Sequence, residues 1–482
     1  MFLPMLALLS GCAVGPRFHA PGLPVPGRFA ASGNQPPAWP QPGWWRNFGS
    51  PELDRLMAQA RLHNFSVRIA VAQLEAANAQ IEIAGAPLLP AVTASGGGSF
   101  EQAGTSAARS SSRSSFSTLG GLSSGSGKTI DTRSFTASFQ ASYQLDFWGK
   151  NYDALRAAQA NAAAAAFNAS TVALTEEAAV ATTYFQTIAY QDELAIARQN
   201  LAAAEGLLRQ LQAELRAGVT DSATVAQQAA LVASERATIP NLQSEMRQQA
   251  IGLGILTGTA PEFLRVRGGA LGALRVPSIN PGLPSQLLER RPDIAQAEAT
   301  LIAANDDVRA AIAAFFPSIT LTGSAGWQST ALNALFSPGS FLLSAASSVA
   351  QPIFEGGALA GQLNVNRATY REDVARYEQS VVQAFTDVET ALTALHYATR
   401  QEALERAAVT RARDALAGAQ AQLNAGTVNI STVLTAQQTL LSDENTLEQA
   451  RLTRFDAAVN LYKALGGGWT LANAEARSPE IP

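Results

Sequence analysis

Residues 121–130 read GLSSGSGKTI and end in the residue types of a phosphate-binding loop. In such a loop, backbone N–H groups surround the phosphates of a nucleotide and a lysine side chain reaches them. The full motif, G-x-x-x-x-G-K-[ST], places its first glycine five residues before the second. That position is Leu122, and Gly121 lies one residue too early. The spacing therefore departs from that of a nucleotide site.

The residues on either side of Lys128 also disagree with a nucleotide-binding protein. An NTPase needs a buried apolar strand before the loop, a helix after it and an acidic strand for Mg²⁺. The preceding residues, SSSRSSFSTLGG, are polar and of low complexity, and an alternating strand pattern follows from Ser134. We interpret residues 101–131 as a polar surface loop between two strands.

Cys12, the one cysteine of the chain, ends a short apolar run, MFLPMLALLSGC. Such a run followed by small residues is typical of a secretory signal. The residues LSGC resemble a bacterial lipobox, which implies that 1–11 are cleaved off and that Cys12 is acylated, with Ala13 after it implying sorting to the outer membrane. The alternative is a buried free cysteine near the terminus. No Lys or Arg precedes the run, so we expect the true start of the signal peptide to lie upstream.

The composition offers little further chemistry. The 482 residues carry 15% charged side chains and a net charge of −4, which disfavours a nucleic-acid partner. No apolar run reaches the roughly 18 residues of a transmembrane helix. His19, His63 and His396 are far apart in the sequence, and a single cysteine builds no metal cluster of ordinary spacing. We expect no catalytic residue, no cofactor and no metal site.

The chain contains an internal duplication. The segment that begins at Asn64 aligns without gaps with the segment that begins at Arg291. Two further matches follow in the same order: YQLDFWGK with AQPIFEGG, and the Ala-Gly pairs at 217–218 and 425–426. Three matches at a nearly constant offset predict two structural repeats of about 210–230 residues.

Each predicted repeat has a helix, two strands, a long helix without internal proline and, after a glycine turn, a final helix. A stretch of about 70 residues makes a helix of roughly 100 Å. On periodicity alone, a long coiled coil without a pore fits these helices equally well. The predicted chain begins with a lipidated extended segment over 12–50 and continues with repeat 1 over 51–257, which consists of helix 51–86, strands 88–100 and 132–148, long helix 149–217 and helix 222–257. A linker over 258–284 leads to repeat 2 over 285–465, which consists of helix 285–314, strands 317–327 and 341–354, long helix 357–425 and helix 430–465. Residues 466–482 form a tail.

The strand pattern favours a membrane-embedded barrel. From Ser134, SFTASFQASYQLDF alternates hydroxyl or amide residues with apolar ones, which indicates a strand with one wet and one apolar face. The alternative is the edge of a soluble β-sandwich. Four strands cannot close a barrel, and an open edge in lipid leaves backbone groups without partners, so other subunits must close it. Two chains would supply eight strands and three would supply twelve; helices that enclose a duct favour three.

Several stretches resemble a known family: WWRNFGSPELDRL, LPSQLLERRPDIAQAEATL, FFPSITLTG and the lipobox. They resemble outer-membrane efflux lipoproteins, the TolC-like outer-membrane factor family in its NodT/OprM-type branch, over nearly the whole chain from Cys12 to about Trp469. The resemblance implies an α+β membrane protein: a homotrimer with a twelve-stranded β-barrel in the outer membrane and a twelve-helix tunnel in the periplasm. It also implies a passive, gated exit duct that works with a periplasmic adaptor (membrane fusion) protein and an inner-membrane efflux pump. The cargo is not implied, because selection in this architecture lies mainly in the pump.

The resemblance further implies that the two glycine turns meet the adaptor. Their residues are Gly218, Val219, Thr220 and Asp221 in repeat 1 and Gly426, Thr427, Val428 and Asn429 in repeat 2. The alternative for each turn is a plain helix C-cap.

For the pore gate, the resemblance points to the long helix of repeat 2, where Asp414 is flanked by Arg411 and Arg413. A ring of like carboxylates on a threefold axis attracts cations and disfavours anions. The alternative is a surface pair between Asp414 and Arg411, three residues apart on one helix face.

A different functional class remains as an alternative to the duct. A structural or adhesive surface lipoprotein made of long coiled-coil helices would also carry a lipobox and long alanine-rich helices. Such a protein would not need the second strand pair or the repeated glycine turns, so the sequence favours the duct.

Overall fold

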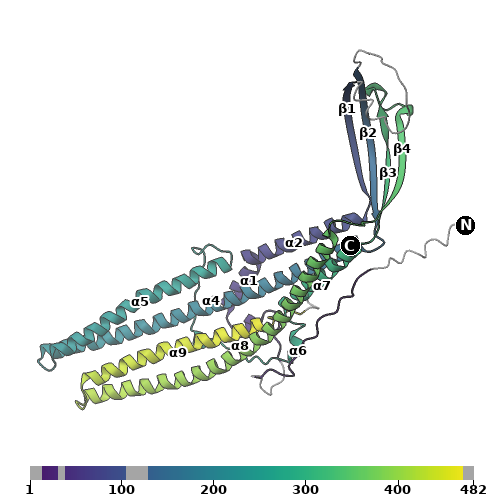
Figure 1. Cartoon of the computed structure of the whole chain (residues 1–482). Helices are drawn as coiled ribbons and strands as arrows, with labels where there is room; N and C mark the ends of the chain where they lie inside the picture. Colours follow the sequence, from purple (N-terminus) through teal and green to yellow (C-terminus); the bar gives the residue numbers. More distant parts are fainter. Residues whose placement is uncertain (1–13, 31–37, 105–128, 471–482) are drawn as a thin grey trace, which may run out of the picture. The chain divides into compact units, whose positions relative to one another are not determined.

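The computed structural model describes residues 14–30, 38–104 and 129–470, and the chain forms two compact units. Among the described residues, the strand unit comprises those within 1–18, 78–159 and 302–371 and contains a four-stranded sheet. The helix unit comprises the described residues within 19–77, 160–301 and 372–482. Figure 1 labels the elements of both units.

The sheet combines one strand pair from each half of the chain. Strands β1 (Ala91–Gly104), β2 (Thr129–Leu145), β3 (Ser318–Ser329) and β4 (Phe341–Ala350) are antiparallel in the order β1-β2-β3-β4 (Figure 1). The two halves join through β2 and β3. In the isolated chain, β1 and β4 are open edges, and every residue of β4 is exposed to solvent. The sheet is therefore incomplete as a barrel.

The predicted alternation in β2 is matched across the register of the sheet. Phe139 lies between Ala94 of β1 and Ala325 of β3, whereas Ser138, its neighbour, lies between Ser95 and Gly326. Successive side chains of a strand point to opposite faces. The sheet thus has one apolar face and one face of hydroxyl and amide groups.

The end of β2 is set by the start of the next helix. The Asp146 Oδ2 atom accepts the N–H of Tyr152 at 2.8 Å, in the first turn of α4 (Lys150–Arg216), so the strand stops at Leu145 rather than at 148. Trp148 donates its Nε1–H to the Pro317 carbonyl at 2.8 Å and stacks on Phe316. These contacts join the ends of β2 and β3. Strand β4 ends at 350 instead of 354.

Two helical hairpins follow the strand pairs (Figure 1). Helices α4 and α8 (Ala358–Asn424) each have 67 residues, and the returning helices α5 (Ser222–Leu256) and α9 (Ile430–Ala464) each have 35. Their ends lie within one residue of the predicted bounds. Salt bridges hold each pair together, at 2.6 Å between Arg236 and Glu205 in the first and at 2.7 Å between Arg413 and Glu444 in the second. Among the described helices, none is both long and apolar enough to cross a membrane.

The first helix of each half is interrupted, so the prediction of single helices over 51–86 and 285–314 was wrong. In the first half, α1 (Pro51–His63) ends at Asn64, whose Oδ1 accepts the N–H of Val67 at 3.0 Å and caps α2 (Phe65–Gly85). In the second half, α6 (Pro284–Leu287) is separated from α7 (Pro292–Ala313). Proline favours the first position of a helix and disfavours helical backbone in the residue before it.

The largest core of the helix unit is built around the N-terminal WWRNF sequence. These residues form η2 (Trp44–Phe48), in which Trp44, Trp45 and Phe48 are buried. The Trp44 ring stacks on Tyr462 of α9 with centroids 4.9 Å apart, and Phe48 lies 5.0 Å from Phe185 of α4. Large aromatic surfaces dominate core energetics, so this segment fastens α4 and α9 to each other.

Candidate functional site

The turn at the end of α4 is a helix C-cap built on a left-handed glycine. Gly218 has φ 73°, its N–H donates to the Leu215 carbonyl at 3.0 Å, and the Val219 N–H donates to the Glu214 carbonyl at 2.9 Å. These two bonds define a Schellman motif. Val219 is 75% exposed although it is apolar. The turn therefore presents a hydrophobic side chain to its surroundings.

The turn at the end of α8 repeats this geometry. Gly426 has φ 71°, its N–H donates to the Leu423 carbonyl at 2.9 Å, and the Thr427 N–H donates to the Gln422 carbonyl at 3.0 Å. A Cβ atom added to Gly218 or to Gly426 would meet no atom within 4 Å. Of the eight turn residues singled out from the sequence, Thr220 and Val428 are half-buried and the others are exposed. Both turns are accessible to a partner.

The two turns differ in charge. Asp221 starts α5, and the backbone N–H of Thr224 donates to its carboxylate at 2.8 Å, which holds the pKa of Asp221 below its usual value. In the second turn Asn429 stands at the corresponding start of α9 and brings no charge. A ligand that meets both turns therefore meets one carboxylate and one amide.

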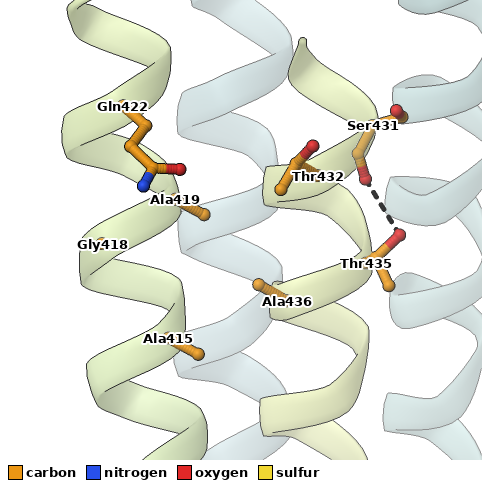
Figure 2. A pocket seen from close by; sticks show the side chains of 8 residues that line it. All are labelled: Ala415, Gly418, Ala419, Gln422, Ser431, Thr432, Thr435 and Ala436. Carbon is orange, nitrogen blue, oxygen red and sulfur yellow. Dashed lines mark hydrogen bonds between the residues drawn. The ribbon is translucent and has the colours of Figure 1, made fainter. Parts of the chain in front are cut away.

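A groove of about 640 Å³ lies between α8 and α9 beside the second turn (Figure 2). Figure 2 shows small side chains facing each other across it, with Thr435 donating its hydroxyl to the Ser431 carbonyl at 2.9 Å. Small residues allow close approach of another backbone, and hydroxyl groups offer hydrogen bonds. The lining contains no ionisable group: Ala415, Gly418, Ala419, Gln422, Ser431, Thr432, Thr435 and Ala436. This groove offers small side chains and hydroxyl groups between α8 and α9.

Asp414 lies on an exposed part of α8 in the isolated chain. Its Oδ2 is 3.6 Å from Arg411 Nη1, and the two side chains are 67% and 85% exposed. Arg413, the other arginine beside it, instead binds Glu444 of α9. The charge of Asp414 is therefore accessible to solvent, and its partner is an exposed arginine on the same helix.

The polar face of the sheet is a second functional surface. Hydroxyl groups meet across strands at Ser95–Ser138 (3.1 Å) and at Ser324–Ser344 (2.8 Å). A face of this kind suits contact with water, whereas the opposite face, which carries Phe139, suits lipid. This pairing of faces is what a strand in the wall of a water-filled barrel requires.

Two sequence features fall wholly or partly outside the described residues. Cys12 and its lipobox lie outside them, as do Gly127 and Lys128 of the GKT sequence. Thr129 is the first residue of β2, so a strand follows Lys128 where a nucleotide site needs a helix. Within the described part of the chain, no group of three or more His, Cys, Asp or Glu side chains could hold a metal ion.

Sequence reasoning assigned no contact to Arg291, although it belongs to the RRPD stretch. The side chain is buried, and it donates to Asp293, to Asp387 of α8 at 3.0 Å and to the Ala464 carbonyl at the end of α9 at 3.2 Å. Burial disfavours the charged guanidinium, but the hydrogen bonds that it donates to the two carboxylates outweigh this effect and raise its pKa further. The adjoining Pro292 and Asp293 signalled a helix start locally, whereas nothing in the sequence signalled the contacts of Arg291 with α8 and α9.

A family model described as outer membrane efflux protein matches residues 56–259 and 283–467. The pyoverdine export outer membrane protein OpmQ of Pseudomonas aeruginosa is 36% identical over 469 residues, which cover 96% of this chain and 95% of that protein. The probable outer membrane lipoprotein SilC of Salmonella typhimurium is 30% identical, with 96% and 97% covered. The open state of the Neisseria gonorrhoeae MtrE outer membrane channel superposes with a TM-score of 0.83 at 29% identity, over 95% of this chain and 98% of that one.

Proposed function

Because the chain belongs to the outer membrane efflux protein family, we propose that three copies of it assemble into one gated exit duct. The family places the protein in the outer membrane as an efflux channel. Three sheets of four strands make a barrel of twelve, which helices that enclose a duct favour over the eight strands of a dimer. A lone sheet would leave its two edges unpaired in lipid, at a cost of several kcal/mol for each unsatisfied group.

The observation that carries the proposal is the open sheet with one polar and one apolar face. Closing three such sheets would turn Ser138 and its hydroxyl neighbours toward the lumen and Phe139 toward lipid. The duct would act by passive transport without catalysis. Its cargo would be small molecules from the periplasm; the relative OpmQ is named for the export of pyoverdine.

The tips of the helical hairpins are proposed as the contact site for a periplasmic adaptor, which would link the duct to an inner-membrane pump. The support is the exposure of both turns and the groove between α8 and α9. Binding there would bias an equilibrium between closed and open tips, because a ligand shifts populations by its differential affinity for the two states. Asp414 is proposed to contribute a carboxylate to the closed pore, and Arg411 to neutralise part of its charge. Acylated Cys12 would anchor the chain to the membrane.

The assembly and the channel are tested together on protein purified in detergent. Light scattering coupled to gel filtration should give the mass of three chains after subtraction of the detergent. Planar-bilayer recordings should show a small conductance that is mostly closed. A monomer that stays soluble without detergent and hydrolyses ATP would exclude the proposal.

A further inference from the structure

A cluster of buried charged side chains lies in the helix unit where α4, α8 and α9 meet. Glu402 of α8 is its best-satisfied carboxylate. It accepts from Arg406 on its own helix at 2.6 Å and from Arg454 of α9 at 2.7 Å, and it lies 3.7 Å from Arg451. Burial alone would raise the pKa of Glu402, but the hydrogen bonds from Arg454 and Arg406 outweigh it and the pKa is lowered. Glu402 is therefore better stabilised as an anion than an ordinary glutamate.

Glu448 of α9 is buried in the same cluster but is not satisfied in the same way. Its Oε1 pairs with Arg451, one turn along the helix, whereas its Oε2 is buried without a hydrogen-bond partner. The charged groups that α4 turns toward it, Asp192 and Glu193, are also carboxylates. A buried ionised oxygen without a donor is unfavourable, and neighbouring like charges add to the cost. A proton on Glu448 removes the negative charge, and with it the repulsion and most of the cost of burial.

The linker between the two repeats is attached to this cluster. Leu271, a buried residue of η4 (Leu271–Ala273), donates its N–H to Asp192 Oδ2 of α4 at 2.7 Å. The next residue, Gly272, packs on Arg451, because a Cβ atom added there would lie 3.3 Å from Nη1. The linker therefore joins α4 to α9 through the residues that surround Glu448.

We infer that Glu448 is a proton-binding site whose occupancy sets how firmly α4 and the linker hold α9. With the proton bound, α9 packs tightly; with Glu448 ionised, repulsion from α4 loosens the contact. The charged groups that act on it are Asp192 and Glu193 of α4 and Arg451 of its own helix, and Arg451 also lies 3.7 Å from Glu402 of α8. Glu448 lies in α9, the returning helix of repeat 2, and acts on α4, the long helix of repeat 1.

The protonation range supports a role near neutral pH. Burial raises the pKa of Glu448 to about 7; the positive charge of Arg451 lowers this pKa in part, and the negative charge of Asp192 raises it further. The folded protein then binds a proton that the locally opened chain, with the ordinary pKa of 4.5, does not bind. The contact of α9 with α4 and the linker is therefore strongest at low pH and weakens as the pH rises through about 7. Below the ordinary pKa of 4.5 it gains no further strength.

Hydrogen exchange on the detergent-solubilised protein tests the inference, with rates corrected for the intrinsic effect of pH. The amides of α9 around Glu448 and the amide of Leu271 should be roughly tenfold better protected at pH 5.5 than at pH 8.0. Glu448→Gln imitates the protonated acid, so its protection should be high at both values. Glu402→Gln is the matched control: it makes the same chemical change in a carboxylate that needs its charge, so protection should fall at both.

Three results would overturn the inference. One is a wild-type protein without pH dependence at these amides. Another is a Glu448→Gln variant that keeps the wild-type pH dependence, which would assign the proton to another buried carboxylate: Asp192 or Glu193 of α4, or Asp456 of α9. The third is a Glu448→Gln variant that loses protection at both pH values, as Glu402→Gln should, because Glu448 would then be an ordinary structural carboxylate. Gel filtration of both variants checks that each still assembles as the wild type does.

Discussion

Asn64 and Arg291 make the same pair of tertiary contacts in the two halves of the chain. Asn64 Nδ2 donates to Glu176 of α4 at 2.8 Å and to the carbonyl of Leu256, the last residue of α5, at 2.9 Å. Arg291 donates to Asp387 of α8 and to the carbonyl of Ala464, the last residue of α9. Each residue precedes a short helix and ties it to the long and the returning helix of its own half. The chemistry differs, because one donor is neutral and the other is charged.

This relationship predicts unequal costs for removing the two side chains. Arg291→Ala leaves the half-buried Asp387 and Asp293 without their cation, and losing these charge-assisted hydrogen bonds should cost about 3 kcal/mol. Asn64→Ala removes a neutral donor and the cap of α2 and should cost about 2 kcal/mol. The unfolding midpoints of the two variants in detergent should therefore fall in the order wild type, Asn64→Ala, Arg291→Ala. An Asn64→Ala variant that is the less stable of the two would contradict the assignment.

The second turn predicts opposite effects for one substitution at two nearby glycines. Gly426→Ala puts a Cβ on a left-handed residue and should cost about 1 kcal/mol, although nothing obstructs the methyl group. Gly418→Ala adds the same methyl group in the interior of α8, again without obstruction, and should stabilise by a similar amount. Hydrogen exchange at the hairpin tip measures both. If both substitutions changed the stability of the tip in the same direction, backbone conformation would not decide their effect.

Asp414 provides the prediction for the proposed gate. Asp414→Asn removes a carboxylate from each of three chains, so block by divalent cations should weaken by roughly tenfold and anion permeability should rise in bilayer recordings. Glu372 is the matched control, because it also forms an exposed pair, with Arg376, on the same helix. Glu372→Gln should leave the block unchanged. If Asp414→Asn also leaves it unchanged, Asp414 does not line the constriction.

Asp456 of α9 predicts a pH-dependent loss of stability. Burial raises its pKa to about 7, and its Oδ1 has no hydrogen-bond partner. The folded state then holds a proton that the unfolded state, with a pKa of 3.8, releases, so stability falls as the pH rises from about 4 to about 7. Asp456→Asn should abolish this contribution. Its stability relative to wild type should increase by about 2 kcal/mol between pH 5 and pH 8, measured from unfolding midpoints. A constant difference would show that Asp456 does not titrate in this range.

Local chemistry in the sequence determined the faces of β2 and the ends of the long helices. The period of two in SFTASFQASYQLDF specified the faces of β2, and Gly218 and Gly426 specified where the long helices turn, because strand alternation and left-handed backbone depend on residues next to each other. Asn64 was missed as a helix break because its partners, Glu176 and Leu256, lie 112 and 192 residues away.

Only the tertiary structure decided which charged groups meet. Arg413 is next to Asp414 in the sequence and Arg411 is three residues away, yet Arg411 pairs with it and Arg413 binds Glu444 of α9. Successive helix residues point about 100° apart, and the packing of α9 on one side of α8 determines which arginine finds a partner there. The same holds for Arg451 and Glu402, which lie on different helices. The sequence carries the charges and the helix period, whereas their pairing depends on the register in which the helices pack.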